Sequence, residues 1–268
     1  SPNTNLLVYR KDIFKAKGLK EPETWDDFIK VAEAMMEKDK DGRVSRYGLS
    51  LPGVGLFINI AVGELTKANG GRLFDPKTGR PYPDFGEGGS VNLRLGTEPY
   101  RWTGAPQVCR DVVIVGASMS DSPPNKEGTP GDVRAYDVRT GKLRWTFHVI
   151  PRAGEFGVDT WKNNSWQYTG HANLWSLISA DEQLGYAYLL LTSPTSDMYG
   201  GHRQGDNLFS STLVCVDCLT GKRIWHYQLA HHDLWDYDLP AAPVLADITV
   251  DGRRVRAVVQ VTKQAFAF

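Results

Sequence analysis

The sequence shows no excess of charge of either sign and no long apolar run. Its 31 basic and 31 acidic residues give a formal net charge of zero, so no basic surface favours a nucleic-acid partner and no polybasic run favours a membrane surface. No apolar stretch approaches the ~18 residues of a membrane-spanning helix, and the first residues lack the sections of a signal peptide. The chain starts without Met and stops in the apolar run VVQVTKQAFAF, so we expect an excerpt of a longer protein.

Cysteine is scarce, with three copies at Cys109, Cys215 and Cys218. An odd count is a poor basis for a disulfide framework. Cys215 and Cys218 have the C-x-x-C spacing of a metal site, but no second pair is present to complete four ligands. Apolar packing in a strand and a turn is therefore favoured over zinc binding for these side chains.

The first part of the chain, to about residue 72, is typical of a helical α/β segment. Thr24 followed by Asp27 has the spacing of a capping box, in which each side chain bonds the backbone N–H of the other residue. Apolar residues then recur at helical intervals, which predicts one amphipathic helix of about three turns with its apolar stripe in a core. That stripe consists of Trp25, Phe28, Ile29, Ala32, Met35 and Met36.

From about Leu73 the composition changes to glycine, proline, aromatic residues and short β-rich runs such as DVVIVGAS and GYAYLLLT. VRAYDVRTGKLRW and LVCVDCLTGKRIW share D-x-x-T-G-K-x-x-W at identical offsets 80 residues apart, and a shorter copy, LFDPKTGRP, begins at Leu73. Asp-x-x-Thr-Gly suits a tight turn between strands, and the Trp is placed to pack one sheet on the next. Repeated short antiparallel sheets of this kind predict a β-propeller.

This region resembles the dehydrogenases that depend on pyrroloquinoline quinone (PQQ), in particular the branch related to membrane glucose dehydrogenase. The matching blocks include TGAPQVCRDVVIVGAS, YGGHRQGDNLFSSTLV and HHDLWDYDLPAAPVLADITVDGRRV. The resemblance implies a mainly β fold, part of an eight-bladed β-propeller of the quinoprotein type, with PQQ and a divalent cation in a funnel on its axis. It also implies an enzyme that oxidises a sugar or alcohol hydroxyl and passes electrons to a quinone or cytochrome acceptor.

The earlier part resembles an internal piece of a family 1 extracellular solute-binding protein, the sugar-capturing component of ABC uptake transporters. LLVYRKDIFKAKGLKEPETWDDFIKVAEAM and YGLSLPG carry this resemblance, and the two resemblances meet near GGRLFDPKTGRP. We therefore expect a join of two incomplete genes, with an α/β fragment of the periplasmic-binding-protein type over residues 1–72 and a propeller fragment over residues 73–268. Both families work outside the cytoplasm, which implies a periplasmic or extracytoplasmic origin.

The PQQ-enzyme resemblance assigns catalytic roles to two residues. Asp236, the second Asp of an H-D-x-W-D motif, matches the general base that takes the proton of the substrate hydroxyl. The family's basic quinone contact follows 27 residues later, where Lys263 stands in VTKQ. Its ammonium would bond a quinone oxygen and stabilise the charge that develops on reduction. A surface carboxylate and a solvated strand lysine are the alternatives, and this spacing disfavours them.

Four more residues match family contacts to PQQ. Trp175 in GHANLWS matches the tryptophan that stacks on the quinone, and the alternative for it is a Trp packed between blades. Asn173 stands where the family has a polar contact to the ring. Thr103 and Ser118 match hydroxyl contacts to the carboxylates of the cofactor, and their separation of 15 residues agrees with the family.

The implied cation site is incomplete in this sequence. Relatives supply a Glu after the VIVG-type strand, where Asp121 is the nearest acid, and an Asn near Ser193, where this chain has none. Asp236 remains as a ligand, and Asp238 either adds an oxygen ligand or caps a turn. Carboxylate oxygens of this kind suit Ca²⁺ or Mg²⁺.

Three functions remain open from the sequence. The first is a fragment of a PQQ-dependent sugar or alcohol dehydrogenase, the second is an extracellular sugar-binding protein based on the N-terminal part, and the third is an inactive fusion. Open blades would expose unpaired strand edges and apolar faces. We therefore expect no measurable dehydrogenase turnover from the chain of 268 residues alone.

Overall fold

The computed structural model describes residues 11–22, 24–35, 37–38, 44–46, 83–94, 103–120 and 125–268. The chain forms two compact units, Ser1–Pro52 and Gly53–Phe268. The predicted join near residues 70–80 and the short copy of the turn motif that begins at Leu73 lie outside the described residues.

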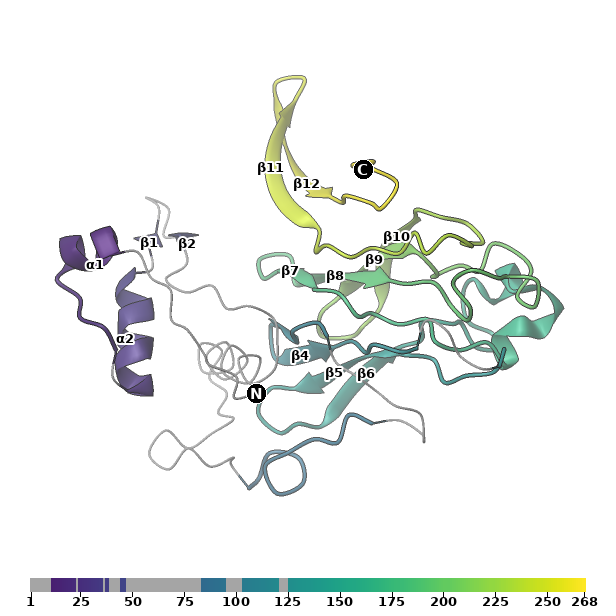
Figure 1. The fold of residues 1–268 in the computed structure, drawn as a ribbon, viewed down its shortest axis with the longest axis horizontal. Coiled ribbons are helices and arrows are strands. Elements are labelled where there is room, and N and C mark those ends of the chain that lie inside the picture. Colours follow the sequence, from purple (N-terminus) through teal and green to yellow (C-terminus); the bar gives the residue numbers. More distant parts are fainter. Residues whose placement is uncertain are drawn as a thin grey trace, which may run out of the picture. The chain divides into compact units, whose positions relative to one another are not determined.

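The described part of the first unit contains α1 (Lys11–Lys17), α2 (Trp25–Met35) and an antiparallel pair of short strands, β1 (Glu37–Lys38) and β2 (Val44–Arg46). The Thr24 hydroxyl accepts a hydrogen bond from the Asp27 N–H at 3.1 Å, and the Asp27 carboxylate accepts one from the Thr24 N–H at 3.2 Å. These two bonds satisfy N–H groups that the start of a helix leaves unpaired. The predicted capping box and helix are confirmed; α2 is drawn in purple in Figure 1.

The predicted apolar stripe of α2 is only partly visible in its described side chains. Ile29, Ala32 and Met35 are half-buried, as residues on one face of a surface helix should be. Met36 lies outside the described residues.

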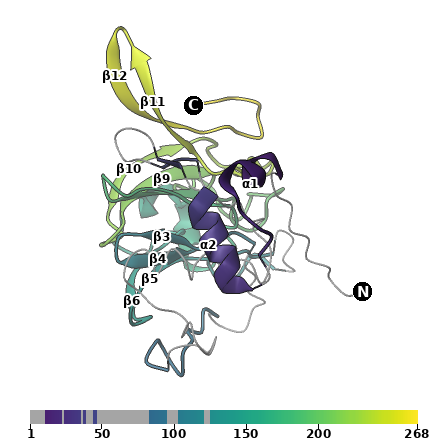
Figure 2. The same cartoon turned by 90° about the vertical axis from the view of Figure 1, so that its left-hand side faces the viewer.

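The described second unit contains two four-stranded antiparallel sheets (Figures 1 and 2). In each sheet the strands pair in chain order. The first sheet contains β3 (Gln107–Cys109), β4 (Val112–Val115), β5 (Val133–Asp137) and β6 (Leu143–Phe147). The second contains β7 (Ser179–Asp181), β8 (Tyr186–Leu191), β9 (Thr212–Asp217) and β10 (Arg223–Gln228). This succession of short antiparallel sheets agrees with the predicted mainly β architecture.

Two 3-10 helices, η1 (Val158–Thr160) and η2 (Lys162–Gln167), lie in the connection between the sheets. After the second sheet, β11 (Val244–Val250) and β12 (Arg253–Val259) form an antiparallel hairpin, drawn in yellow in Figure 1. Most side chains of this hairpin are exposed, including those of Val244, Ile248 and Val250.

The Asp-x-x-Thr-Gly motif forms the same turn in both sheets, as predicted. Oδ1 of Asp217 accepts hydrogen bonds from the backbone N–H and the hydroxyl of Thr220 at 2.8 and 2.7 Å. Asp137 and Thr140 repeat this arrangement at 2.9 and 3.0 Å. The following glycine has a φ of +68° at Gly221, a conformation that glycine adopts without the steric cost of a Cβ.

The tryptophan of the first motif packs on the turn of the second sheet. The Trp145 indole N–H donates to the carbonyl of Cys218 at 2.8 Å. A Cβ atom at Gly221 would lie 2.6 Å from the Trp145 ring, so only glycine permits this close approach. The predicted role of this Trp in packing one sheet on the next is confirmed.

One hydrophobic core is shared by the two sheets. It combines side chains of the first sheet, such as Ile114 and Val133, with side chains of the second, such as Leu189 and Val214, all of them fully buried. Burying apolar surface of this kind is the main stabilising contribution to a fold.

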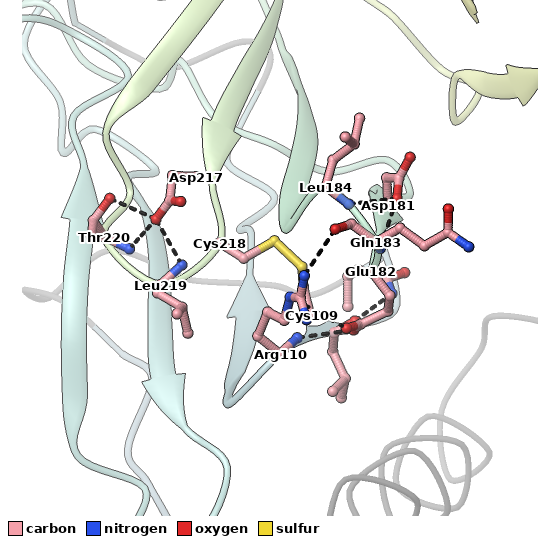
Figure 3. The surroundings of a disulfide bond; sticks show 12 residues. Cys109, Arg110, Asp181, Glu182, Gln183, Leu184, Asp217, Cys218, Leu219 and Thr220 are labelled. Atoms are coloured by element: carbon pink, nitrogen blue, oxygen red, sulfur yellow. Dashed lines mark hydrogen bonds and ion pairs between the residues drawn. A yellow bond between two sulfur atoms is a disulfide. The ribbon is translucent and has the colours of Figure 1, made fainter. Parts of the chain in front are cut away.

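A disulfide bond also joins the two sheets (Figure 3), which corrects the expectation from the odd cysteine count. Cys109, at the end of β3, is bonded to Cys218, directly after β9, and the two lie 109 positions apart in sequence. Cys218 is therefore not available as a zinc ligand. Cys215 is the free, buried cysteine of β9, and burial raises its pKa to about 12. Its predicted role in apolar packing is confirmed.

Candidate functional site

The fold brings together five of the sequence-predicted site residues from four separate segments. Asp236 and Asp238 lie between β10 and β11, and Lys263 follows β12. Trp175 precedes β7, and Thr103 precedes β3. A single chain of polar contacts links these five side chains or their backbones. We call these five residues the Lys263 network.

Lys263 lies between two carboxylates. Its Nζ atom is 2.8 Å from Oδ2 of Asp236 and 2.5 Å from Oδ1 of Asp238. The side chains of Lys263 and Asp236 are 32% and 38% exposed, whereas that of Asp238 is 6% exposed. The Asp236 carboxylate is therefore accessible to a ligand from solution, whereas the Asp238 carboxylate is buried at the bottom of the site.

Asp238 also fixes the tryptophan. The Trp175 indole N–H donates to Oδ2 of Asp238 at 2.6 Å, so the edge of the half-buried ring is held and its orientation is defined. The hydroxyl of Thr103 donates to the Trp175 backbone carbonyl at 2.8 Å. The next residue, Gly104, packs against the backbone of Ser176. A Cβ atom at Gly104 would lie 2.2 Å from the Ser176 carbonyl oxygen, so glycine is required there.

The electrostatics of the site follow from burial and from these contacts. Burial raises the pKa of Asp238, and the hydrogen bonds from Lys263 and Trp175 only partly oppose this effect. Burial would lower the pKa of Lys263, but its bonds to Asp236 and Asp238 outweigh that effect, so the pKa is raised overall. The Lys263 side chain therefore stays positively charged, and a positive charge is what the binding of an anion requires.

Asn173 and Ser118 lie beside the Lys263 network. Ala117 and Leu174 form an antiparallel bridge in which the Ala117 N–H donates to the Leu174 carbonyl at 2.9 Å. Because the bridge is antiparallel, Ser118 after Ala117 and Asn173 before Leu174 lie on the same side of it, on opposite segments. The Asn173 amide N–H donates to the His171 carbonyl at 2.7 Å, and its buried Oδ1 has no hydrogen-bond partner in the described part of the chain.

The predicted cation site is represented by Asp236 and Asp238, since Asp121 lies outside the described residues. Both carboxylates contact the Lys263 ammonium. Among the described residues, no three His, Cys, Asp or Glu side chains gather as a metal centre. The two carboxylates have the oxygen chemistry that suits Ca²⁺ or Mg²⁺, but they supply fewer ligands than either ion takes.

Two buried charged residues lie next to this site, Asp233 and Arg203. The sequence indicates only loop support or a funnel wall for Asp233, as for its neighbours in HHDLWDYDLP, and it indicates no role for Arg203. Asp233 is 1% exposed and Arg203 is fully buried. Charged residues are almost never buried unless they are paired or hydrogen-bonded. Both residues are therefore expected to take part in a network of buried hydrogen bonds. The signal in the sequence is the polar density of HHDLWDYDLP itself, which contains Asp233.

The arrangement can perform two chemical tasks. A partly exposed carboxylate that contacts an ammonium can accept a proton from a bound hydroxyl group. The ammonium has three N–H donors, and two of them serve Asp236 and Asp238, so the third can bind an oxygen of a ligand.

Comparison with known proteins agrees with both resemblances predicted from the sequence. The family described as glucose/ethanol/alcohol dehydrogenase, beta-propeller domain (PQQ), matches residues 65–268. The bacterial extracellular solute-binding protein family matches residues 1–108. Two families within one chain support the predicted join of two genes. No described helix is long and apolar enough to cross a membrane.

Individual relatives give the same result. Quinoprotein glucose dehydrogenase A of Acinetobacter calcoaceticus is 35% identical over 213 residues, which cover 75% of this chain and 26% of the relative. Quinate/shikimate dehydrogenase (quinone) of Acinetobacter baylyi is 36% identical over 211 residues, covering 72% of this chain and 25% of the relative.

Among solved structures, a quinohemoprotein alcohol dehydrogenase of Pseudomonas putida superimposes with a TM-score of 0.62 and 30% identity. The match covers 73% of this chain and 29% of that one. The predicted partial propeller is thereby confirmed, and the chain spans about a quarter of the length of the relatives it matches. The chain belongs to the glucose/ethanol/alcohol dehydrogenase β-propeller family of PQQ-dependent enzymes.

Proposed function

We propose that residues 73–268 form the part of a PQQ-dependent dehydrogenase that contains its general base and its basic quinone contact. The observation that supports this proposal is the contact between Asp236 and Lys263 at 2.8 Å. The sequence predicts complementary roles for the two residues, and their side chains are in contact although they are 27 positions apart.

Asp236 is the proposed base. Its partly exposed carboxylate would take the proton of a sugar or alcohol hydroxyl. PQQ, when bound, would supply the acceptor for the hydride of the substrate carbon. Lys263 keeps its positive charge through its two carboxylate partners, so it can donate to a quinone oxygen and stabilise negative charge there.

Four other residues would hold the cofactor. The Trp175 ring offers a flat surface whose orientation is fixed by Asp238. The unpartnered Oδ1 of Asn173 gives a buried polar atom near the ring position. Ser118 adds a hydroxyl donor for a carboxylate group. Thr103 would do the same after its O–H, which donates to the Trp175 carbonyl here, turns to the cofactor. The chemistry of these side chains fits a planar, anionic quinone.

A cation is the second expected component. Asp236, Asp238 and Asp121 are the proposed ligands, and Ca²⁺ or Mg²⁺ is the expected ion. It would compete with the Lys263 ammonium for the two carboxylates that the ammonium now contacts.

We propose a sugar or an alcohol as the substrate and a quinone or a cytochrome as the electron acceptor. The relatives named for glucose and for quinate or shikimate suggest polyhydroxylated rings. The expected location is periplasmic or extracytoplasmic.

The experiment that tests the proposed function is a titration of the purified chain with PQQ and Ca²⁺, followed by tryptophan fluorescence and near-ultraviolet absorbance. We expect saturable quenching in the parent chain and none in Asp236→Ala or Lys263→Ala. Lys222→Ala, which removes an exposed turn lysine, is the matched control and should quench like the parent. A folded parent chain without quenching would refute the proposal.

A second function is supported for the N-terminal part by the solute-binding family match over residues 1–108. Under that proposal the chain would capture a sugar without quinone or cation. Calorimetric titration with sugars alone tests it, and heat of binding from a sugar in the absence of PQQ is the expected result. A chain that binds neither sugar nor PQQ would be an inactive fusion.

A further inference from the structure

The loop that carries Asp236 is held from within by another carboxylate. Oδ2 of Asp233 accepts hydrogen bonds from the hydroxyls of Ser193 and Ser211, both at 2.7 Å. Oδ2 also accepts from the Tyr237 N–H at 2.8 Å, and Oδ1 accepts from the Trp235 N–H at 3.0 Å. The two backbone donors belong to the residues on either side of Asp236, so the Asp233 carboxylate holds the backbone of both neighbours of Asp236.

A buried arginine secures the base of the same loop. Arg203 donates to the Asp233 backbone carbonyl at 2.7 Å and to Oδ1 of Asn207 at 2.9 Å. It also donates to the carbonyl oxygens of Thr195 and Ser196 at 3.2 and 3.1 Å. Burial lowers the pKa of Arg203 to about 10, although the charge of Asp233 opposes this effect. The attraction between the two opposite charges thus offsets part of the cost of burying Arg203 beneath the loop.

The backbone of this loop adopts a conformation that needs such support. Asp236 has a φ of +56°, and His232 has a φ of +47°. The left-handed region is strained for a residue with a Cβ, and such strain persists only where the surroundings enforce it. The Asp233 hydrogen bonds on both sides of Asp236 are the enforcing contacts.

We propose that Asp233 is a positioning residue, whose fully engaged carboxylate holds Asp236 in its strained conformation and so keeps the Asp236 carboxylate against Lys263. The catalytic meaning of this inference rests on the proposed function, because that function gives the Asp236 and Lys263 pair its role. The structural part, that Asp233 determines the contact, stands on geometry alone.

The test measures the Asp236 and Lys263 contact without cofactor. The full chain is labelled with acetic anhydride over a range of pH, and acetylation of Lys263 is quantified by mass spectrometry. An amine that loses a carboxylate partner has a lower pKa and more of its reactive free form, and half a unit of pKa corresponds to about a threefold change in that form. Asp236→Asn gives the increase expected when the contact is absent.

We expect Asp233→Asn to raise Lys263 acetylation by about threefold or more, toward the Asp236→Asn value. In the Asp236→Asn background the same substitution should add nothing further, because both changes remove one contact. Asp217→Asn is the matched control, since Asp217 also accepts two backbone and one hydroxyl donor in a turn but lies outside the Lys263 network. It should leave Lys263 labelling at the parent value.

Unchanged labelling in a folded Asp233→Asn chain, or an additive effect in the double variant, would overturn the inference. If Asp233→Asn does not fold, the variant Ser193→Ala/Ser211→Ala removes two of the four donors to the Asp233 carboxylate while the carboxylate remains. We expect a smaller increase in Lys263 acetylation in that variant. Parent-level labelling in that variant would then contradict the proposal. Failure of PQQ to quench fluorescence would refute the proposed function but would leave this labelling result unaffected.

Discussion

Asp238 connects the tryptophan and the lysine of the Lys263 network. It is nearly buried, and it accepts the Trp175 indole N–H at 2.6 Å while it pairs with Lys263 at 2.5 Å. The sequence left its role open between a metal ligand and a turn cap. The structure adds a third role, in which one carboxylate sets the orientation of an aromatic ring and the position of an ammonium together.

The substitution Asp238→Asn should therefore destabilise the chain. We expect a loss of about 1.5–3 kcal/mol in the free energy of unfolding, the range for hydrogen bonds to charged groups. Urea denaturation measures it. Asp236→Asn removes a more exposed carboxylate and should cost less. Equal stability of Asp238→Asn and the parent would contradict the assignment.

The raised pKa of Lys263 predicts an alkaline limit to stability. The folded chain holds the Lys263 proton more tightly than the unfolded chain, through Asp236 and Asp238 and in spite of burial. Its contribution is therefore fully present below the unfolded pKa of ~10.4 and is lost as pH rises through the higher folded pKa. We expect the urea midpoint to fall more steeply above pH ~10 in the parent than in Lys263→Met. Parallel curves would refute this expectation.

At the scale of elements, the disulfide joins β3 to the turn that follows β9 (Figure 3). The Arg110 N–H donates to Glu182 at 2.9 Å, and the Arg110 guanidinium donates to the Gln183 carbonyl at 3.0 Å beside it. Covalent and polar links thus hold the same pair of sheets that Trp145 packs together.

Removing this disulfide should destabilise the second unit. A cross-link between residues 109 positions apart strongly lowers the conformational entropy of the unfolded chain. Losing a native disulfide typically lowers the free energy of unfolding by about 2–5 kcal/mol. Cys109→Ala/Cys218→Ala should show this loss in urea denaturation. Cys215→Ala keeps the disulfide and is the control, so reductant should lower its stability but leave the double variant unchanged. A parent chain that is insensitive to reductant would disprove the contribution.

The elements that depend on neighbouring residues were predictable from the sequence. The capping box of α2 and both Asp-x-x-Thr-Gly turns need only residues within a few positions of each other. The disulfide and the Asp233 and Arg203 contacts were not predictable, because they join residues 109 and 30 positions apart with no fixed spacing. The pairing of Asp236 with Lys263 was predictable only through the family resemblance. Their separation of 27 positions is a family pattern, and only the fold brings the two side chains together.

At the scale of the whole molecule, the chain spans about a quarter of the length of the relatives it matches. Its last described hairpin, β11 and β12, leaves apolar side chains such as Val244, Ile248 and Val255 exposed. Exposed apolar surface of this kind is a partner surface or an aggregation risk. The remaining walls of a propeller funnel would have to come from other blades.

We therefore predict that the isolated chain has no measurable dehydrogenase turnover, even where it binds PQQ. Dye reduction with glucose, PQQ and Ca²⁺ measures this, and the expected rate equals that of the Asp236→Ala control. Robust, quinone-dependent dye reduction by the purified chain would show that the described blades suffice and would refute the prediction.

The contact between Trp145 and the turn of the following sheet gives the repeat a direction. The first sheet donates an indole to the turn of the sheet after it, and glycine at Gly221 leaves room for the indole ring. The motif recurs 80 residues later with its Asp, Gly and Trp at identical offsets. A gene rearrangement that keeps this spacing can therefore preserve the contact between the two sheets, whereas one that changes it separates the indole from its turn.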